Sequence, residues 1–230
     1  MERDTFSRLL SGRPSMDADD VVRMREICAR VDGYSDHRHY AFFKHLFGQT
    51  DIRSVLILGV FCGRDIVFML DTAARAGREI SVTGVDKFSD DSCADWPEAL
   101  KGGSWLDAGF GLAPSLTLAR HNIDAFGFGD RVRLIKERDE VFLPACQDRF
   151  DFIYIDTSHD YATMHRQIRQ VLRLLAPGGV LGGDDYRDGG TWGVKRAVSE
   201  SLPNHAVFDG WIWAAPAQSA QQAATALHSR

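Results

Sequence analysis

Apolar residues recur along this chain with two alternating periods. Over residues 17–31 they stand three and four positions apart, the spacing that predicts a helix, and a second helix is expected over residues 37–47. Residues 54–60 (SVLILGV) instead form a continuous apolar run that ends in glycine. Such a run is typical of a parallel strand buried on both faces, so the first core strand is expected there.

The same alternation continues through most of the chain. Further strands are expected at residues 81–85, 132–135, 152–155 and 180–181. The clearest helix covers residues 161–175, where the helical spacing is kept until Ala176-Pro177-Gly178-Gly179 stops it. Strands that alternate with helices predict an α/β fold class with a doubly wound, mostly parallel sheet.

Two regions depart from this alternation. Residues 88–111 are longer than an ordinary connection, which makes them a candidate lid or substrate loop. A short helix over residues 194–201 precedes an expected closing hairpin over residues 206–214, with its turn near Asp209-Gly210. We expect one domain over residues 1–230, with an N-terminal helical segment over residues 1–50 and a frayed tail over residues 217–230.

Composition narrows the function classes. Hydrophobic residues at 44% and charged residues at 26% are ordinary for a globular protein and disfavour a disordered chain. The net charge of −5 and the lack of a basic run argue against a nucleic-acid partner, so a small molecule is expected instead. The four cysteines are scattered and are expected to be reduced thiols. No apolar run resembles a signal peptide or a membrane span. These features predict a cytoplasmic protein without a membrane partner.

Glycines and an acid follow the first two strands, at the edge where open α/β sheets bind ligands. Gly59 and Gly63 let a backbone turn approach a ligand closely before a helix begins. Asp86 ends the second strand, where an acid accepts hydrogen bonds from the ribose of an adenosine cofactor. The dinucleotide fingerprint GxGxxG is absent, which counts against a dinucleotide cofactor.

Two later motifs place acids directly after buried strands: DFIYIDTSHDY (residues 151–161) and LLAPGGVLGGDDY (residues 174–186). If their strands are neighbours, Asp156 converges with Asp184 and Asp185, and three carboxylates there repel one another. A hard divalent cation such as Mg²⁺ would neutralise them. The alternative is that Asp184 or Asp185 caps the following segment.

On these motifs, the chain over residues 54–199 resembles class I S-adenosylmethionine (SAM) dependent methyltransferases. Within that superfamily it is similar to the divalent-metal-dependent O-methyltransferases of the catechol type and of the type that tailors natural-product sugars. The resemblance implies a Rossmann-like fold with a seven-stranded sheet, N-terminal helices and a substrate-loop insertion. It also implies O-methylation of a hydroxyl on a small metabolite, a natural-product sugar or a phenol. A homo-oligomer is left open.

The resemblance also assigns site residues. It implies SAM contacts at Gly59, Phe61, Gly63, Asp65, Asp86, Arg138 and Asp156, and a site for Mg²⁺ or another divalent cation at Asp156, Asp184 and Asp185. Asp65 stands where relatives often carry a serine that holds the SAM carboxylate, so it either binds the amino group or caps the helix. Ile57 replaces the glutamate that is usual two residues before the first glycine.

His159, three residues after Asp156, corresponds to the catalytic base. The alternative is a loop residue packed beside Tyr161, with Ser158 or Asp160 capping the helix. Two rival functions stay open: a metal-independent SAM methyltransferase, and a SAM-binding subunit without turnover.

Aromatic residues that precede the first strand or follow the second along the chain form either a lid over the acceptor or part of the core. They are Trp96, Trp105, Phe110, Tyr34, His37 and Tyr40.

Overall fold

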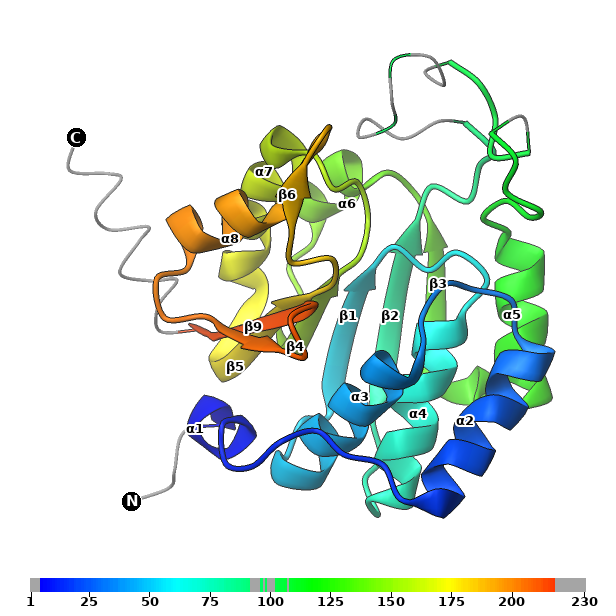
Figure 1. Ribbon diagram of the computed structural model, residues 1–230, viewed down its shortest axis with the longest axis vertical. Coiled ribbons are helices and arrows are strands. Elements are labelled where there is room, and N and C mark those ends of the chain that lie inside the picture. The colour runs from blue at the N-terminus through cyan, green and yellow to red at the C-terminus, as the bar shows by residue number, and fades with distance from the viewer. Residues whose placement is uncertain (1–4, 92–95, 97, 99–101, 107, 218–230) are drawn as a thin grey trace.

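The computed structural model describes residues 5–91, 96, 98, 102–106 and 108–217 (Figure 1). Its central sheet has seven strands in the order β3-β2-β1-β4-β5-β9-β8. Five strands are parallel: β1 (Ser54–Leu58), β2 (Ser81–Asp86), β3 (Val132–Lys136), β4 (Phe150–Ile155) and β5 (Leu175–Gly183). Two antiparallel strands, β9 (Ile212–Pro216) and β8 (Ala206–Phe208), close one edge. The predicted doubly wound, mostly parallel sheet is confirmed.

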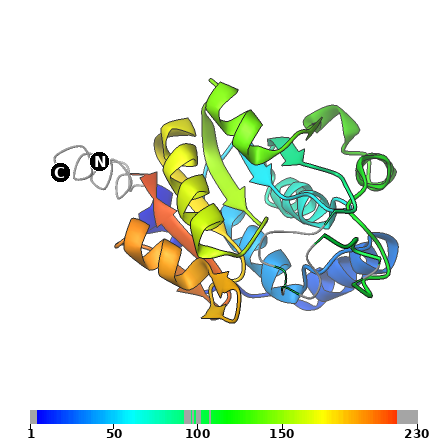
Figure 2. The same cartoon turned by 90° about the horizontal axis from the view of Figure 1, so that it is seen from above.

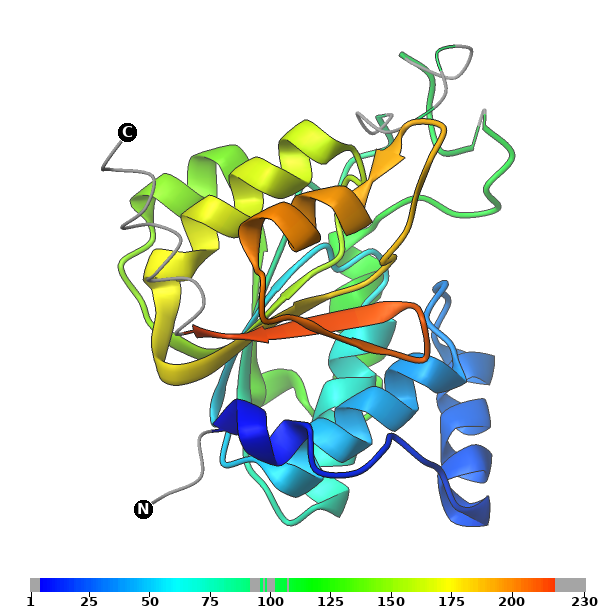
Figure 3. The same cartoon turned by 60° about the vertical axis from the view of Figure 1, so that its left-hand side comes forward.

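Helices cover both faces of the sheet (Figure 3). One face packs against α1 (Thr5–Leu9), α2 (Ala18–Arg30), α3 (His37–Gln49), α4 (Arg64–Arg75) and α5 (Leu116–Ala125). The other packs against α6 (Asp139–Ala145), α7 (Tyr161–Val171) and α8 (Val194–Ser201). Neighbouring residues of β1 point to opposite sides, since Val55 belongs to the first core cluster and Leu56 to the second. Burial on both faces explains the continuous apolar run of this strand.

Most predicted elements lie close to the observed ones, and the largest difference is at β5. The predicted helix over residues 161–175 is too long, because α7 ends at Val171 and a 3₁₀ turn (Leu172–Leu174) follows. The strand then begins at Leu175 instead of residue 180, with a register shift opposite Phe150 and Phe152. Its first part contains Pro177 and two glycines and therefore lacks the apolar signature of a strand. Another 3₁₀ turn, Gly129–Arg131, precedes β3.

The expected C-terminal hairpin is confirmed. Phe208 pairs with Ile212 across a turn in which both Asp209 and Gly210 have positive φ. The predicted frayed tail lies outside the described residues from 218 onward. Within the described part of the chain, every helix is too short or too polar to cross a bilayer.

The carboxyl ends of the parallel strands meet at one edge, which Figure 2 views from above. Backbone hydrogen bonds hold the residues that follow the strands side by side at this edge. The Gly59 N–H donates to Val85, the Asp156 N–H to Leu58, and the Asp184 N–H to Ile155. A two-stranded ribbon, β6 (Asp188–Gly189) and β7 (Trp192–Gly193), stands above this edge. β1 and β4 enclose the point where strand order reverses, which is where open α/β sheets bind ligands.

Candidate active site

The turn after β1 requires glycine. Gly59 has φ +88°, and a Cβ there would lie 1.6 Å from the backbone oxygen of Asp156. Gly63, with φ +91°, is the N-cap of α4 and makes no side-chain capping bond. Between them Phe61 has φ +53°, a conformation that costs energy for a residue with a side chain. The tight turn thus leaves the first N–H groups of α4 directed at the edge of the sheet.

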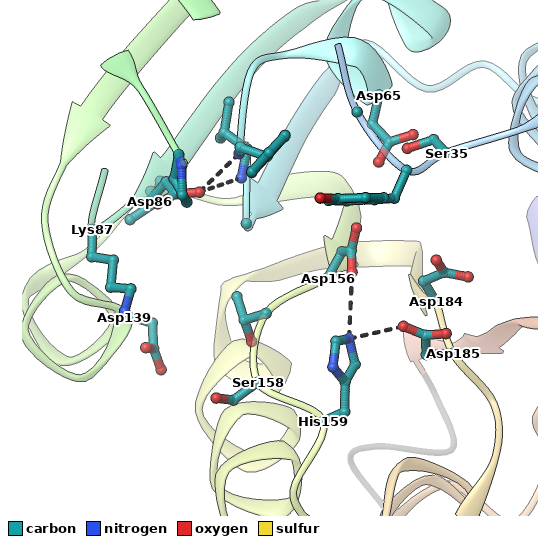
Figure 4. A pocket seen from close by; sticks show the side chains of 18 of the residues that line it. Ser35, Asp65, Asp86, Lys87, Asp139, Asp156, Ser158, His159, Asp184 and Asp185 are labelled. Carbon is teal, nitrogen blue, oxygen red and sulfur yellow. Dashed lines mark hydrogen bonds and ion pairs between the residues drawn. The ribbon is translucent and has the colours of Figure 1, made fainter. Parts of the chain in front are cut away.

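Asp86 holds this turn in place (Figure 4). Its Oδ2 accepts hydrogen bonds from the N–H groups of Val60 (2.8 Å) and Phe61 (2.9 Å), and its Oδ1 accepts one from Phe88 (2.7 Å). The side chain also lines the cavity, where a ribose could reach it. The ribose contact itself stays a prediction. The sequence did not indicate this structural role, because the N–H groups that donate to a carboxylate cannot be read from its position at a strand end.

Asp156, His159 and Asp185 come together beside the turn (Figure 4). His159 Nε2 lies 2.9 Å from Asp185 Oδ2 and 3.7 Å from Asp156 Oδ1, and one ligand atom from each residue lies within 4.8 Å of the others. Burial raises the pKa of Asp156 to about 7. The hydrogen bond with His159 lowers this pKa, and the negative charge of Asp184 raises it further. The cluster therefore favours a proton or a cation.

His159 is positioned from two sides. Its backbone carbonyl accepts the Gly193 N–H at 2.8 Å, and its ring stacks on Trp192 with centroids 4.3 Å apart. The cap of α7 is Asp160, whose Oδ1 accepts the Thr163 N–H at 2.9 Å. His159 is thus outside the helix and lines the cavity.

Asp184 faces a different partner. Its Oδ2 lies 2.8 Å from Nε2 of His39 on α3, and both residues are buried. Burial opposes protonation of His39, but hydrogen bonds with Asp184 and Asp36 outweigh it and raise its pKa well above the usual value. The other oxygen of Asp184 is buried and has no partner among the described residues. No local sequence pattern indicates this contact, because His39 lies far from Asp184 along the chain.

Asp65 lies on the same side, beside Ser35 (Figure 4). Burial raises the pKa of this carboxyl, although the positive charge of His39 lowers it. Its Oδ1 is buried without a hydrogen-bond partner in the described part of the chain. Because Gly63 is the N-cap of α4, the capping alternative for Asp65 is wrong. An acceptor aimed into the cavity suits an ammonium group.

The opposite end of the cavity is polar. Arg138 lies in the cavity wall, and its guanidinium pairs with Asp91 at 3.3 Å and Glu140 at 3.8 Å. Next to it Asp139, which we did not predict, accepts a hydrogen bond from Gln167 at 3.0 Å. Asp139 stands three residues after the end of β3, near the edge where open α/β sheets bind ligands, and this position is the signal that could have identified it.

Part of the predicted aromatic lid lines the cavity. Trp105 packs against Phe61 and Phe110, with ring centroids 5.5 and 4.8 Å apart, and Tyr34 lies 5.4 Å from Phe61. Tyr40 is core instead, since it is fully buried and its hydroxyl donates to Asp71 at 2.7 Å. Several residues of the predicted 88–111 lid lie outside the described part of the chain. Lid function stays a prediction.

These groups line a single cavity of about 710 Å³. That volume accommodates a nucleoside-sized cofactor with a small acceptor beside it. The buried acceptor on Asp65 and the tight turn at Gly59 fit the amino-acid end of SAM. The oxygen-rich donors of Asp156 and Asp185, together with the unpartnered oxygen of Asp184, fit a hard divalent cation.

Comparisons with known proteins identify the family and the fold. A family model described as a methyltransferase domain matches residues 56–186. No curated protein sequence matches the chain.

Solved structures with a similar fold include O-methyltransferases. A putative O-methyltransferase from Klebsiella pneumoniae is 18% identical, with a TM-score of 0.57 over 93% of this chain and 95% of that chain. An O-methyltransferase from Bacillus cereus in complex with SAH is 17% identical, with a TM-score of 0.54 over 92% and 95%. The O-methyltransferase NovP is 18% identical, with a TM-score of 0.61 over 78% and 79%. The family match, together with this sheet order, confirms the resemblance, and the chain belongs to the methyltransferase domain family as a class I SAM-dependent methyltransferase.

Proposed function

We propose that this protein transfers the methyl group of SAM to a hydroxyl of a small molecule with the help of a divalent cation. The observation that carries the proposal is the meeting of Asp156, His159 and Asp185 beside the Gly59 turn. Acids and a base at this point serve the deprotonation of a hydroxyl, and the turn brings a cofactor next to them.

Each end of the cavity has a part in holding SAM, which supplies an electrophilic methyl group on a positively charged sulfur. Asp65 accepts hydrogen bonds from the amino group, and Gly59 allows close approach of the chain. Asp86 receives the ribose hydroxyls while it holds the turn, and Arg138 lies on the adenine side together with Asp139. The O-methyltransferase from Bacillus cereus, whose structure contains SAH, has a similar fold. That shared fold is the support it lends to this orientation of SAM.

Asp156 and Asp185 would hold the cation together with the unpartnered oxygen of Asp184. The chemistry that Mg²⁺ supplies at such a site is to lower the pKa of an acceptor hydroxyl and to orient it. A cation would offset the repulsion among the three carboxylates, and their hard oxygen ligands favour Mg²⁺ over a softer metal.

His159 takes the proton of the acceptor in this proposal. Its Nε2 faces both Asp156 and Asp185, and the stack on Trp192 with the backbone bond from Gly193 fixes the ring. A neutral imidazole is a suitable general base near neutral pH.

Two rivals give different results in one experiment. Incubation with SAM and a panel of hydroxylated metabolites, in Mg²⁺ or in EDTA, is followed by mass spectrometry of the products. A metal-independent methyltransferase keeps its activity in EDTA. A SAM-binding subunit without turnover binds SAM in calorimetry and produces no methylated compound under either condition.

A further inference from the structure

Arg187 differs from the other cations in the described wall of the cavity. Each of the others has an oxygen partner within 3.3 Å: Arg38 with Asp36, Arg64 with the Val31 carbonyl, Lys87 and Arg138 with Asp91, and Arg166 with Asp139. The guanidinium of Arg187 instead lies over two indoles, with its carbon 3.8 Å from the ring centre of Trp192 and 4.6 Å from that of Trp211. Among the residues that the structure describes, no oxygen pairs with this guanidinium, whose N–H groups are open to solvent.

The backbone around Arg187 is anchored on both sides. Its own N–H donates to the Asp185 carbonyl at 2.6 Å, and its carbonyl accepts the Lys195 N–H at 3.2 Å. The preceding residue, Tyr186, donates its N–H to the Trp211 carbonyl at 2.8 Å. The backbone that carries Arg187 is thus held in place before any ligand binds, which reduces the backbone entropy lost on binding.

The same indole connects Arg187 to the candidate base. The Trp192 ring that lies under the guanidinium also stacks on His159, with centroids 4.3 Å apart and planes 21° apart. Asp185, two residues before Arg187, faces the same histidine at 2.9 Å. A group bound by Arg187 would therefore belong to the molecule whose hydroxyl faces His159.

A guanidinium stacked on aromatic rings keeps its N–H donors at its edge, where their fork matches a planar carboxylate. Most charged groups of the cavity wall are carboxylates, so a dianionic phosphate meets more repulsion there than a carboxylate with one charge. We propose that Arg187 binds the carboxylate of the methyl acceptor, which is a hydroxylated carboxylic acid. This inference rests on the proposed function, since it names the acceptor class of that site.

The test compares two probes that differ in one charge: protocatechuate, a catechol with a carboxylate, and its uncharged primary amide. Calorimetry measures their binding to protein loaded with SAH and Mg²⁺. We expect the acid to bind about ten- to a hundred-fold more tightly than the amide, as a charge-assisted pair provides. Arg187→Gln removes this preference and changes the affinity for the amide less than about two-fold. Arg187→Lys keeps the charge but loses the fork, so it retains part of the preference.

Arg196→Gln is the matched control, because Arg196 pairs with Glu200 on α8 and is not among the residues that line the cavity. It should leave both affinities unchanged. The inference is overturned if neither probe binds, if acid and amide bind equally, or if the preference survives in Arg187→Gln. Methyl transfer to the wider metabolite panel tests the proposed function separately. If the protein methylates neutral hydroxyl compounds and binds acid and amide equally, the acceptor class is wrong and the proposed function stands.

Discussion

Replacing Asp86 by asparagine should destabilise the protein by about 2 kcal/mol. The carboxylate accepts three backbone N–H groups, two from the turn after β1 and one from Phe88, at 2.7 to 2.9 Å. An amide has a single acceptor oxygen, so at least one N–H loses its partner, and the other bonds lose the assistance of the charge. Loss of one hydrogen bond to a charged group costs about 1.5 to 3 kcal/mol, and partial exposure of Asp86 lowers the total because water replaces part of it.

Urea unfolding measures this change, and in thermal unfolding the same loss lowers Tm by about 4 to 8 °C for a domain of this size. Glu137→Gln is the control, since Glu137 lines the same cavity and is also partly buried, but among the described residues its side chain accepts a single hydrogen bond, from the Arg138 N–H. It should change stability by less than about 0.5 kcal/mol. If Asp86→Asn also changes the free energy of unfolding by less than about 0.5 kcal/mol, these hydrogen bonds do not hold the turn.

Three further variants test separate parts of the account. His159→Ala should lower kcat by about 10²- to 10⁴-fold with little change in SAM affinity, measured by steady-state kinetics and calorimetry; an unchanged kcat contradicts its role as the base. Tyr40→Phe leaves Asp71 without its buried hydroxyl partner and should cost about 1 to 2 kcal/mol in urea unfolding with kcat preserved; a loss of activity at full stability contradicts its place in the core. Although burial raises the pKa of Asp36, hydrogen bonds with His39 and Arg38 hold it below its usual value, so its contribution to stability is present above pH ~4 and lost as the pH falls further. Asp36→Asn should therefore be less stable than wild type at pH 7 and approach it in acid, and an equal difference at every pH would contradict this assignment.

The sequence predicted the sheet well because burial on both faces leaves a direct trace in the apolar runs. The start of β5 was missed, since a strand that contains Pro177 and glycines has no such trace. The acids after β4 and β5 were predicted as neighbours because parallel strands end at one edge, and the structure places them there.

Partners from distant segments could not be predicted in the same way. His39 meets Asp184 because α3 packs against the sheet, and nothing in its local spacing indicates that contact. For Tyr40, on the same helix, the sequence allows either a lid or the core, and the structure places it in the core. The direction in which a helix face points depends on tertiary packing. Arg187 owes its environment to two indoles, Trp192 and Trp211, that α8 and β8 separate along the chain.

Metal-assisted O-methylation is measured by the transfer of an isotopically labelled methyl group from SAM to hydroxylated acceptors, followed by mass spectrometry. In Mg²⁺ we expect a product that carries the label on an oxygen, and in EDTA we expect none until Mg²⁺ is restored. A labelled product that forms equally in EDTA, or a label found on carbon or nitrogen, would contradict the proposed metal-assisted O-methylation.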